Sequence, residues 1–221
     1  MLPARAGTSR LPLPVGVFGE RIVAALARTS AIDVVTPRSG PASRERPPRR
    51  RERAWIRAAQ AGSDEAMEAL FRVHWGPAHR AAFLIVHDAA AAEDIAQEAF
   101  LSAIRALDRF DRRRPFGPWL HRIVVNRAID WSRARTLRRE VAEAVESEAP
   151  PERQVGWSEE IVAALGALDP DQRAAVVLRH LLEYTPGEIA DLLEIPRGTV
   201  NSRLRRALDR LASELAPEDS A

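Results

Sequence analysis

The sequence contains no cysteine and no lysine. Without cysteine the chain can form neither a disulfide framework nor a cysteine-ligated zinc site, and it fits a reducing cytoplasm. All 33 basic residues are arginine, which indicates a coding bias, so their number alone says little about nucleic acid. Against 31 acidic residues the formal net charge is only +2. The distribution of charge along the chain is therefore more informative than its total.

Long uninterrupted apolar runs are also missing. The apolar patch Leu11–Phe18 is short, broken by proline and followed by charged residues, so neither a secretory signal nor a membrane span is expected. The first fifty residues show no sustained helical or strand period, are rich in proline and lead into the basic run Arg44–Arg53. We predict a disordered extension over residues 1–52. A start codon assigned too far upstream is the alternative.

Motifs of catalysis and metal binding are absent as well. The chain has no Gly-x-Ser-x-Gly elbow, no glycine-rich phosphate loop and no loop framework with paired carboxylates. His74, His79 and His87 have no companion ligands at metal spacing, so each is predicted to be a core or surface histidine. These absences argue against a hydrolase or nuclease, and we expect no catalytic residue, metal or cofactor.

The segment Asp169–Leu211 has the pattern of a helix-turn-helix. Asp169 and Thr185 are each followed by proline and, three residues after the cap, by glutamine or glutamate, which is typical of a capped helix start. The second helix is expected to be about two turns long, because Pro196 disfavours helical geometry in the residue before it. A third helix begins near Arg197, with one apolar stripe formed by Val200, Leu204, Leu208 and Leu211.

The last of these helices has the charge of a DNA reader. Residues 197–206 contain four arginines and no acid. Arginine binds guanine edges and phosphates, and asparagine can bind adenine, in a groove that admits a helix. A solvated outer face is the alternative for a lone basic helix, but the preceding caps and turn favour DNA. The predicted contacts are Arg197, Thr199, Asn201, Ser202, Arg205 and Arg206.

Residues 53–139 are predicted to form several helices around a core. A short helix ends before Gly62, and Ser63 caps the next. Gly76-Pro77 is expected to restart the chain into a buried helix that ends near His87. A longer helix, opened by Asp88, follows from about residue 90 to residue 110. The spacing predicts inward positions for Met67, Leu70, Phe71, His74, Ile95, Ala99, Phe100, Ala103, Ile104 and Leu107.

Arginines and aromatic residues are interleaved between Arg105 and Arg139. This stretch has eleven arginines and only three aspartates. Phosphates need cations and unstacked bases need aromatic faces, so the composition is typical of single-stranded DNA binding. A helix is expected over Trp119–Arg135 with two partly apolar stripes, one beginning at Leu120 and the other at Trp119. Periodicity alone does not decide which stripe is core.

Composition changes sharply at residue 140. Residues 140–160 contain seven glutamates, one arginine and the pair Pro150-Pro151, without a core pattern. We predict a flexible acidic linker over residues 140–158. The predicted fold class is all-α, with two small helical domains at residues 53–139 and 159–215 joined by this linker.

Two parts of the chain resemble bacterial sigma factors of the extracytoplasmic-function (ECF) group. The run Tyr184–Leu204 is similar to their region four, and Ala92–Leu101 is similar to their region-two helix. Their promoter-melting segment matches Phe116, Trp119, Leu120, Ile123, Asn126 and Asp130. Two residues depart from the pattern. Glu194 stands where glycine is commonest, at a cost of about 1 kcal/mol if that residue is left-handed. Asn201 stands where a basic residue is usual, which leaves the promoter sequence open.

The resemblance implies an initiation factor without an active site of its own. It implies that the RNA polymerase core is bound by Asp94, Gln97, Glu98 and Leu101. It also implies that the melted promoter strand, with its flipped base, is held by Arg112, Arg113, Arg114, Phe116, Trp119, Asn126 and Arg127.

The partners implied are polymerase core and promoter DNA, in the cytoplasm and without membrane insertion. Whether an anti-sigma factor holds the protein inactive stays open. A repressor or response regulator that binds DNA alone is the rival interpretation, but no strand period or heptad seam supports one.

Overall fold

The structure, a computed structural model, describes residues 48–142 and 159–214, and within them it is helical with no strand, as the predicted all-α class requires. An N-terminal unit consists of α2 (Arg49–Gln60), α3 (Asp64–Val86), α4 (Ala89–Ala106), the short 3-10 helix η1 (Leu107–Arg109) and α5 (Phe116–Ala142). A C-terminal unit consists of α6 (Glu159–Gly166), α7 (Pro170–Val176), the π-helical turn η2 (Val177–Leu181), α8 (Pro186–Leu193) and α9 (Arg197–Glu214). Residues 1–47 of the predicted extension and residues 143–158 of the predicted linker lie outside the described residues. The predicted boundaries at residues 52 and 140 are wrong, because α2 already begins at Arg49 and α5 continues to Ala142.

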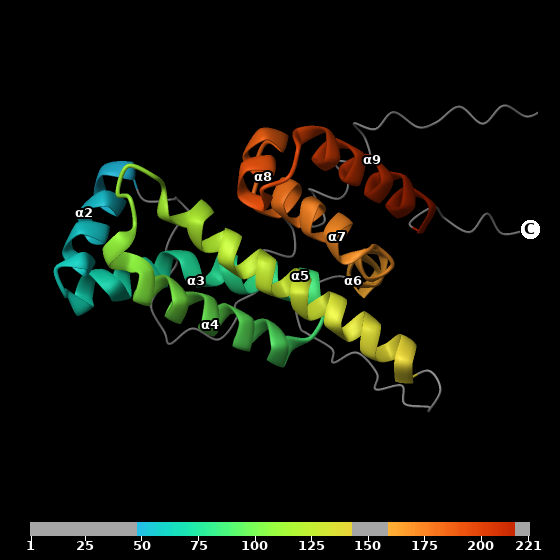
Figure 1. Cartoon of the computed structure of the whole chain (residues 1–221), viewed down its shortest axis with the longest axis horizontal. Coiled ribbons are helices and arrows are strands. Elements are labelled where there is room, and N and C mark those ends of the chain that lie inside the picture. Colours follow the sequence, from blue (N-terminus) through green and yellow to red (C-terminus); the bar gives the residue numbers. More distant parts are fainter. Residues whose placement is uncertain (1–47, 143–158, 215–221) are drawn as a thin grey trace, which may run out of the picture.

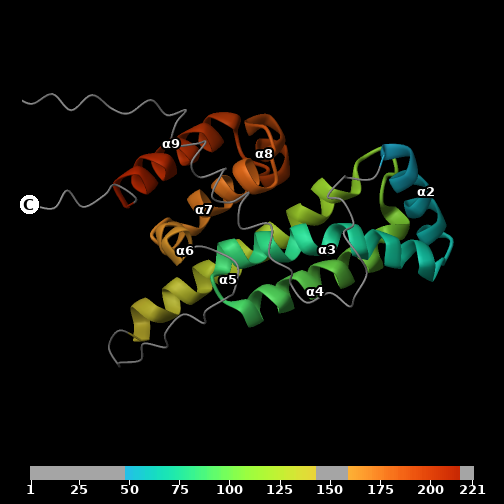
Figure 2. The same ribbon diagram turned by 180° about the vertical axis from the view of Figure 1, so that it is seen from behind.

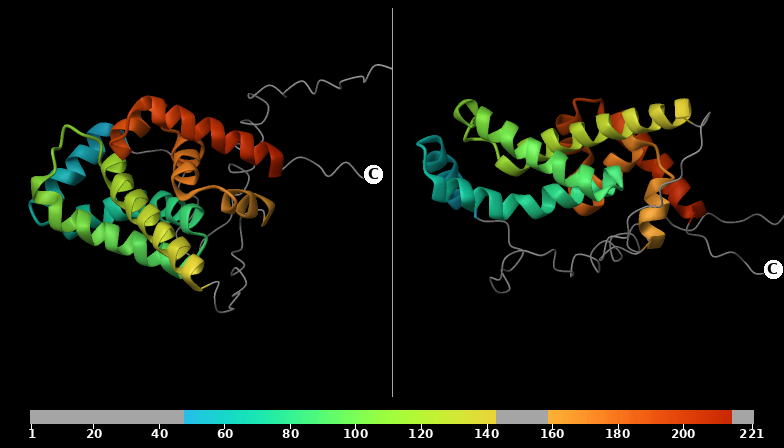
Figure 3. Two further views of the ribbon diagram at one scale, coloured as in Figure 1. Left: turned by 45° about the vertical axis from the view of Figure 1, so that its right-hand side comes forward. Right: turned by 90° about the horizontal axis from the view of Figure 1, so that it is seen from below.

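The two units lie against one another. Helices α3, α4 and α5 run side by side, and α2 covers one end of them (Figure 1). The C-terminal unit packs on α3 and α5, with α7 between α9 and α5 (Figures 1 and 2). Two further directions show the same close arrangement (Figure 3). Helix α9, predicted to read duplex DNA, therefore lies across α7 from α5, the helix predicted to bind melted DNA.

Helix α3 continues through Gly76-Pro77, so the predicted restart at this pair is wrong. Proline removes one backbone hydrogen bond from a helix, and its ring disfavours helical geometry in the residue before it. Here that residue is glycine, whose missing Cβ relieves much of the clash. Beyond the pair, α3 buries every residue from Ala81 to Val86, because α4 and α5 pack on it together with the C-terminal unit.

Helix starts follow the predicted caps at most positions. The side chains of Ser63 and Asp88 each accept a hydrogen bond from the backbone N–H three residues later, at 3.2 and 3.0 Å. Asp169 is the exception, because its side chain makes no capping bond although α7 begins at Pro170 as predicted. The predicted inward positions are also mostly buried. The inward positions predicted for Phe71 and Ile104 are wrong, since each is 41% exposed and no helix of the described residues covers it.

The centre of the contact between the units is a buried hydrogen bond. The Nδ1 atom of His121 on α5 lies 2.7 Å from the hydroxyl oxygen of Tyr184, and both residues are 4% exposed. Val125 and Ile129 continue this face of α5 and are likewise buried. Two ion pairs flank it, Arg122–Glu194 at 2.5 Å and Arg133–Asp171 at 2.7 Å. The contact therefore has a buried centre and charged edges.

A buried arginine of α7 ties the ends of two helices together. The guanidinium of Arg173 donates to the carbonyl of Ile85 in α3 at 2.5 Å. It also donates to three carbonyls at the end of α6, those of Leu165, Gly166 and Leu168, at 2.8, 3.0 and 2.9 Å. The last carbonyls of a helix lack intrahelical partners and carry partial negative charge, so a cation is favourable there. Burial lowers the pKa of Arg173 to about 10, which leaves it charged at neutral pH.

His87 ends α3 beside this arginine. Its backbone is left-handed, with φ 54°, and a Cβ placed on Gly166 of α6 would lie 3.4 Å from its Nδ1 atom. Burial, and to a smaller degree the charge of Arg173, lowers the pKa of His87 to about 3. The histidine is therefore neutral in the folded chain at any pH near 7.

The backbone hydrogen bond that α3 lacks at Pro77 gives the first prediction. Replacing Pro77 by alanine should restore the missing backbone hydrogen bond and raise the free energy of unfolding by about 1–3 kcal/mol. The measurement is urea unfolding followed by circular dichroism. Pro186→Ala is the matched control, because Pro186 is the first residue of α8, where the N–H has no helical partner anyway. A lower stability for Pro77→Ala would mean that contacts of the proline ring outweigh helix continuity.

The second prediction concerns acid. As the pH falls below about 6.5, the unfolded chain protonates His87 while the folded chain does not, so the free energy of unfolding falls. From pH 7 to pH 5 this histidine alone should remove about 1–2 kcal/mol. His87→Asn, which tolerates the left-handed backbone, should flatten the pH dependence over that window by this amount. Parallel stability curves for the two proteins would exclude His87 as the cause.

Candidate polymerase and DNA interfaces

The outer face of α4 is polar with one apolar residue. Asp94, Gln97 and Glu98 are exposed, and Leu101 is 51% exposed. The helical period produces this face, because the positions between them, Ile95, Ala96, Ala99 and Ala103, are buried against α3 and α5. The four residues predicted to bind polymerase thus lie together on one surface.

This face is linked to α5 by a single arginine. Arg127 of α5 forms an ion pair with Glu98 and donates to the hydroxyl of Ser102 at 2.9 Å. Gln97 donates to Glu93 on the same helix at 3.1 Å. Glu98 was predicted to bind polymerase and Arg127 to bind melted DNA. The structure brings these two side chains into direct contact.

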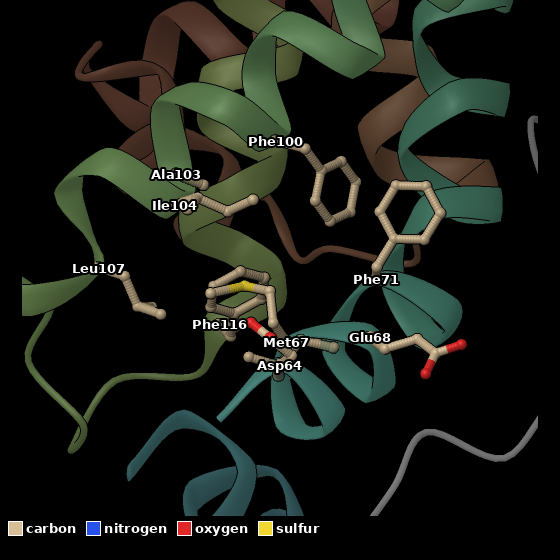
Figure 4. A pocket seen from close by; sticks show the side chains of 10 residues that line it. Asp64, Met67, Glu68, Phe71, Phe100, Ala103, Ile104, Leu107 and Phe116 are labelled. Carbon is tan, nitrogen blue, oxygen red and sulfur yellow. The ribbon is translucent and has the colours of Figure 1, made fainter. Parts of the chain in front are cut away.

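An apolar cavity lies between α3, α4 and the start of α5. It has a volume of about 240 Å³, and apolar residues dominate its lining, with Asp64 and Glu68 at the edge. Phe71 and Phe100 both line it and pack against one another, with ring centroids 5.0 Å apart (Figure 4). Ile104 and Phe116 close its other sides. The spacing predicted core positions for Phe71 and Ile104, whereas in the structure both residues line this cavity.

The loop before α5 presents three exposed arginines. Arg112, Arg113 and Arg114 are solvent-facing, and the Asp111 carboxylate accepts a hydrogen bond from the Arg113 backbone N–H at 2.9 Å. That bond is a local turn of the kind aspartate favours. The loop thus holds its guanidinium groups on the surface, and residues 111–115 are themselves all exposed.

Aromatic rings support this loop from below. Phe116 is only 3% exposed, packed at centroid distances of 5.1, 5.9 and 5.5 Å from His74, Phe110 and Trp119. The sequence suggested that Phe116 could stack on a base, but this burial leaves it no free face. Trp119 is half-buried and lies 4.6 Å from Phe110. Of the two predicted aromatic contacts, Trp119 is the one that still reaches the surface.

Helix α5 has three faces, which resolves the question left open by periodicity. The stripe through Leu120, Val124 and Ala128 is fully buried in the N-terminal unit. The stripe with Trp119 and Ile123 half-buried leads to Asn126, which is exposed. The third stripe, His121, Val125 and Ile129, lies under the C-terminal unit and was missed. Its residues are spaced by four in the sequence, but each stands next to a residue of one of the two other stripes, so the third stripe was not recognised.

The helix-turn-helix has its predicted geometry. Thr185 and Glu188 form a reciprocal capping box, with the Thr185 backbone N–H donating to the glutamate at 2.8 Å and the Glu188 N–H to the threonine hydroxyl at 3.3 Å. Glu194 ends α8 at φ 54° and ψ 42°, the left-handed conformation considered for it. In α9, Val200, Leu204, Ala207 and Leu211 are buried.

The predicted reading residues of α9 lie on its outer surface. Arg197, Asn201, Arg205 and Arg206 are exposed, while Thr199 and Ser202 are half-buried and joined by a hydrogen bond from the serine hydroxyl at 2.9 Å. Arg203, which was not among the predicted contacts, forms an ion pair with Asp171 at 3.1 Å. The helix therefore presents a basic outer face on a packed apolar base.

The histidines of the described residues take structural positions. His74 is buried and its Nε2 lies 2.9 Å from the carboxylate of Glu52 in α2. Among the described residues, no three histidine or acidic side chains gather as a metal site would need. None of the helices in this part of the chain is both long and apolar enough to cross a membrane.

Comparison with known proteins identifies the family. The description "Sigma-70 region 2" matches residues 70–138, and "Sigma-70, region 4" matches residues 158–211. The ECF RNA polymerase sigma factor SigM of Mycobacterium tuberculosis H37Rv is 37% identical over 158 residues, covering 71% of this chain and 81% of its own. The chain belongs to the ECF group of the sigma-70 family. The ECF sigma factor SigW of Bacillus subtilis is also similar, at 30% identity over 176 residues, covering 72% of this chain and 94% of its own.

Solved structures show the same fold as this sigma factor. CnrH in complex with the cytosolic domain of CnrY has a TM-score of 0.57 at 28% identity, covering 74% of this chain and 96% of that one. RpoE of Bartonella quintana, in complex with the anti-sigma factor NepR, has a TM-score of 0.56 at 25% identity, covering 68% and 97%. In our ECF factor the region-2 match begins within α3 and ends within α5, and the region-4 match covers α6 to α8 and most of α9.

Proposed function

We infer that this ECF factor binds RNA polymerase core and directs promoter-specific transcription initiation. The order of its parts carries the inference, since a region-2 unit precedes a region-4 helix-turn-helix, and both match the family. We propose residues 53–139 as the domain for polymerase binding and promoter melting and residues 159–215 as the duplex reader. Residues 143–158 are the proposed linker, and the proposed N-terminal extension is shortened to residues 1–47, because α2 begins at Arg49.

Polymerase core is proposed to dock on the outer face of α4. Three exposed polar residues, Asp94, Gln97 and Glu98, surround the exposed apolar side chain of Leu101. A polar rim around an apolar residue is the usual anatomy of a protein interface. The family resemblance assigns the same face to the polymerase, so sequence and exposure agree.

Promoter DNA is proposed to contact two surfaces. Arg197, Thr199, Asn201, Ser202, Arg205 and Arg206 of α9 would read the upstream duplex in its major groove. The downstream strand, once melted, would be held by Arg112, Arg113, Arg114, Trp119, Asn126 and Arg127. Phe116 takes a supporting role beneath the loop in this proposal, because it is buried. Asn126 offers both a donor and an acceptor, so it can read the edge of a flipped base.

The remaining assignments concern chemistry, compartment and regulation. We propose that the chain catalyses no reaction and acts in the cytoplasm, where polymerase is found. We also propose that an anti-sigma factor binds it. RpoE in the complex above is bound to one, and here Phe71 and Ile104, both partly exposed, line the 240 Å³ cavity. Contiguous exposed apolar surface of this kind marks partner sites.

Run-off transcription tests the proposed function. Purified core enzyme is supplied with a library of promoter fragments from the source genome, with and without the chain, and transcript starts are mapped. Initiation at a shared pair of elements only in the presence of the chain supports the proposal. A chain that binds DNA but yields no transcript with core enzyme supports the rival repressor instead.

The polymerase face yields a prediction. Asp94→Arg should weaken core binding by about tenfold or more, because it reverses a charge within the proposed interface. The measurement is fluorescence anisotropy with purified core, with circular dichroism as a check on folding. Asp191→Arg makes the same charge change on the exposed surface of α8 and should leave core affinity nearly unchanged. Equal affinities for Asp94→Arg and the wild type would remove this face from the interface.

The surface proposed to hold the melted promoter strand yields a further prediction. Asn126→Ala should leave core binding and duplex binding nearly intact but block open-complex formation, since a flipped base needs a pocket to offset a few kcal/mol of lost stacking. Permanganate footprinting of the downstream strand measures the melting. A pre-melted promoter should rescue most of the loss. Thr136→Ala, at an exposed position further along α5 and outside the proposed contacts, is the control and should melt the promoter. Normal permanganate reactivity with Asn126→Ala on duplex promoter would return Asn126 to a structural role.

A further inference from the structure

One carboxylate binds an arginine from each proposed DNA-binding helix. Asp171, in the first turn of α7, accepts two hydrogen bonds from Arg133 of α5, at 2.9 and 2.7 Å. The same carboxylate lies 3.1 Å from Arg203 of α9. Asp171 thus joins the helix proposed to hold melted DNA to the helix proposed to read duplex DNA, and α7 lies between them (Figures 1 and 2).

Both arginines stand next to proposed DNA contacts. Arg133 follows Asn126 by two turns on α5, and Arg203 lies between Ser202 and Arg205 on α9. The Arg133 side chain is 55% exposed and that of Arg203 is 23% exposed. A second acid of the C-terminal unit, Glu194, pairs in the same way with Arg122 of α5. The C-terminal unit therefore neutralises arginines of α5 at two places.

Phosphate and carboxylate compete for arginine. One terminal nitrogen of Arg133 donates to both oxygens of Asp171. A guanidinium donates to phosphate oxygens in the same way as to a carboxylate, so a DNA phosphate can replace Asp171. The exchange becomes possible when the units separate, because the pair with Arg133 bridges them. Its exposed position at the edge of the contact makes the pair weak enough to exchange.

We propose that Asp171 is an internal substitute for a DNA phosphate: it holds the free sigma factor closed and keeps Arg133 and Arg203 from DNA. Promoter phosphates take its place on Arg133 when the two units open and compete with it for Arg203, which makes both arginines additional DNA contacts. This proposal rests on the proposed function for the identity of its ligand.

Domain separation tests the closing role. The chain has no native cysteine, so dyes can be placed on full-length protein at two exposed positions, Ala90→Cys on α4 and Asp209→Cys on α9. Asp171→Asn should lower the energy-transfer efficiency at low salt. High salt should lower it in the wild type too, because exposed ion pairs are screened. Asp191→Asn removes the same charge from exposed α8 and should change neither.

DNA affinity tests the competition. Without polymerase, Asp171→Asn should bind a forked promoter fragment about two- to fivefold more tightly than the wild type, the range an exposed ion pair supports. Arg133→Gln should open the units equally but bind the fragment more weakly than Asp171→Asn, with a salt slope reduced by about one. Added to Arg133→Gln, the Asp171→Asn change should recover only a small part of its gain, through Arg203.

Several results would overturn the proposal. Unchanged energy transfer in Asp171→Asn would show that the pair does not hold the units. An equal affinity gain from Asp191→Asn, or an undiminished gain in the Arg133→Gln background, would reduce the effect to net charge. A lower melting temperature without opening would make Asp171 a structural residue of α7. The wild-type run-off assay is independent of these measurements, so a failure of the proposed function is recognised separately.

Discussion

The packing of α5 determines how the two units can be arranged. This helix buries one stripe, Leu120, Val124 and Ala128, in its own unit and a second, His121, Val125 and Ile129, beneath the other unit. Only the stripe that leads from Trp119 to Asn126 faces outward. A helix with two apolar faces needs two partners, because exposed aliphatic side chains cost free energy in water. The C-terminal unit provides the second partner in this structure.

That constraint has an energetic meaning for initiation. On the proposed function, the two units separate to read two promoter elements, which would uncover Val125, Ile129 and the hydrogen bond between His121 and Tyr184. Interactions with polymerase and DNA have to offset this exposure. The closed form would then be the resting form of the free protein, and contacts made only in the assembled complex would drive opening.

Local features could be read from the sequence because their causes are local. The capping box of Thr185 and Glu188 depends on neighbouring residues and was predicted, and the left-handed turn at Glu194 was considered as one possibility. The same holds for the polar face of α4, whose exposure follows from the period of the helix. Residues that act on the DNA or polymerase were inferred from resemblance and exposure, and they stay predictions.

Features that depend on distant partners could not be read in this way. Pro77 was taken as a break, but packing on several sides of α3 outweighs the loss of one hydrogen bond. Phe71 and Ile104 have core spacing, yet no element of the described chain covers them. The third stripe of α5 has meaning only when a segment more than fifty residues away packs on it, as the His121–Tyr184 bond illustrates.

The arginine-only composition has a chemical consequence at Arg173. A lysine starts with a pKa of about 10.4, and the burial that lowers the pKa of Arg173 to about 10 would lower the pKa of a lysine from that smaller starting value. An ammonium group also has only three N–H donors where a guanidinium has five, and four carbonyls converge on this side chain. A lysine here would leave at least one carbonyl without a donor and would lose its proton at a lower pH than the arginine does. What began as coding bias thus gives the junction of α3, α6 and α7 a cation that keeps its charge and serves every acceptor around it.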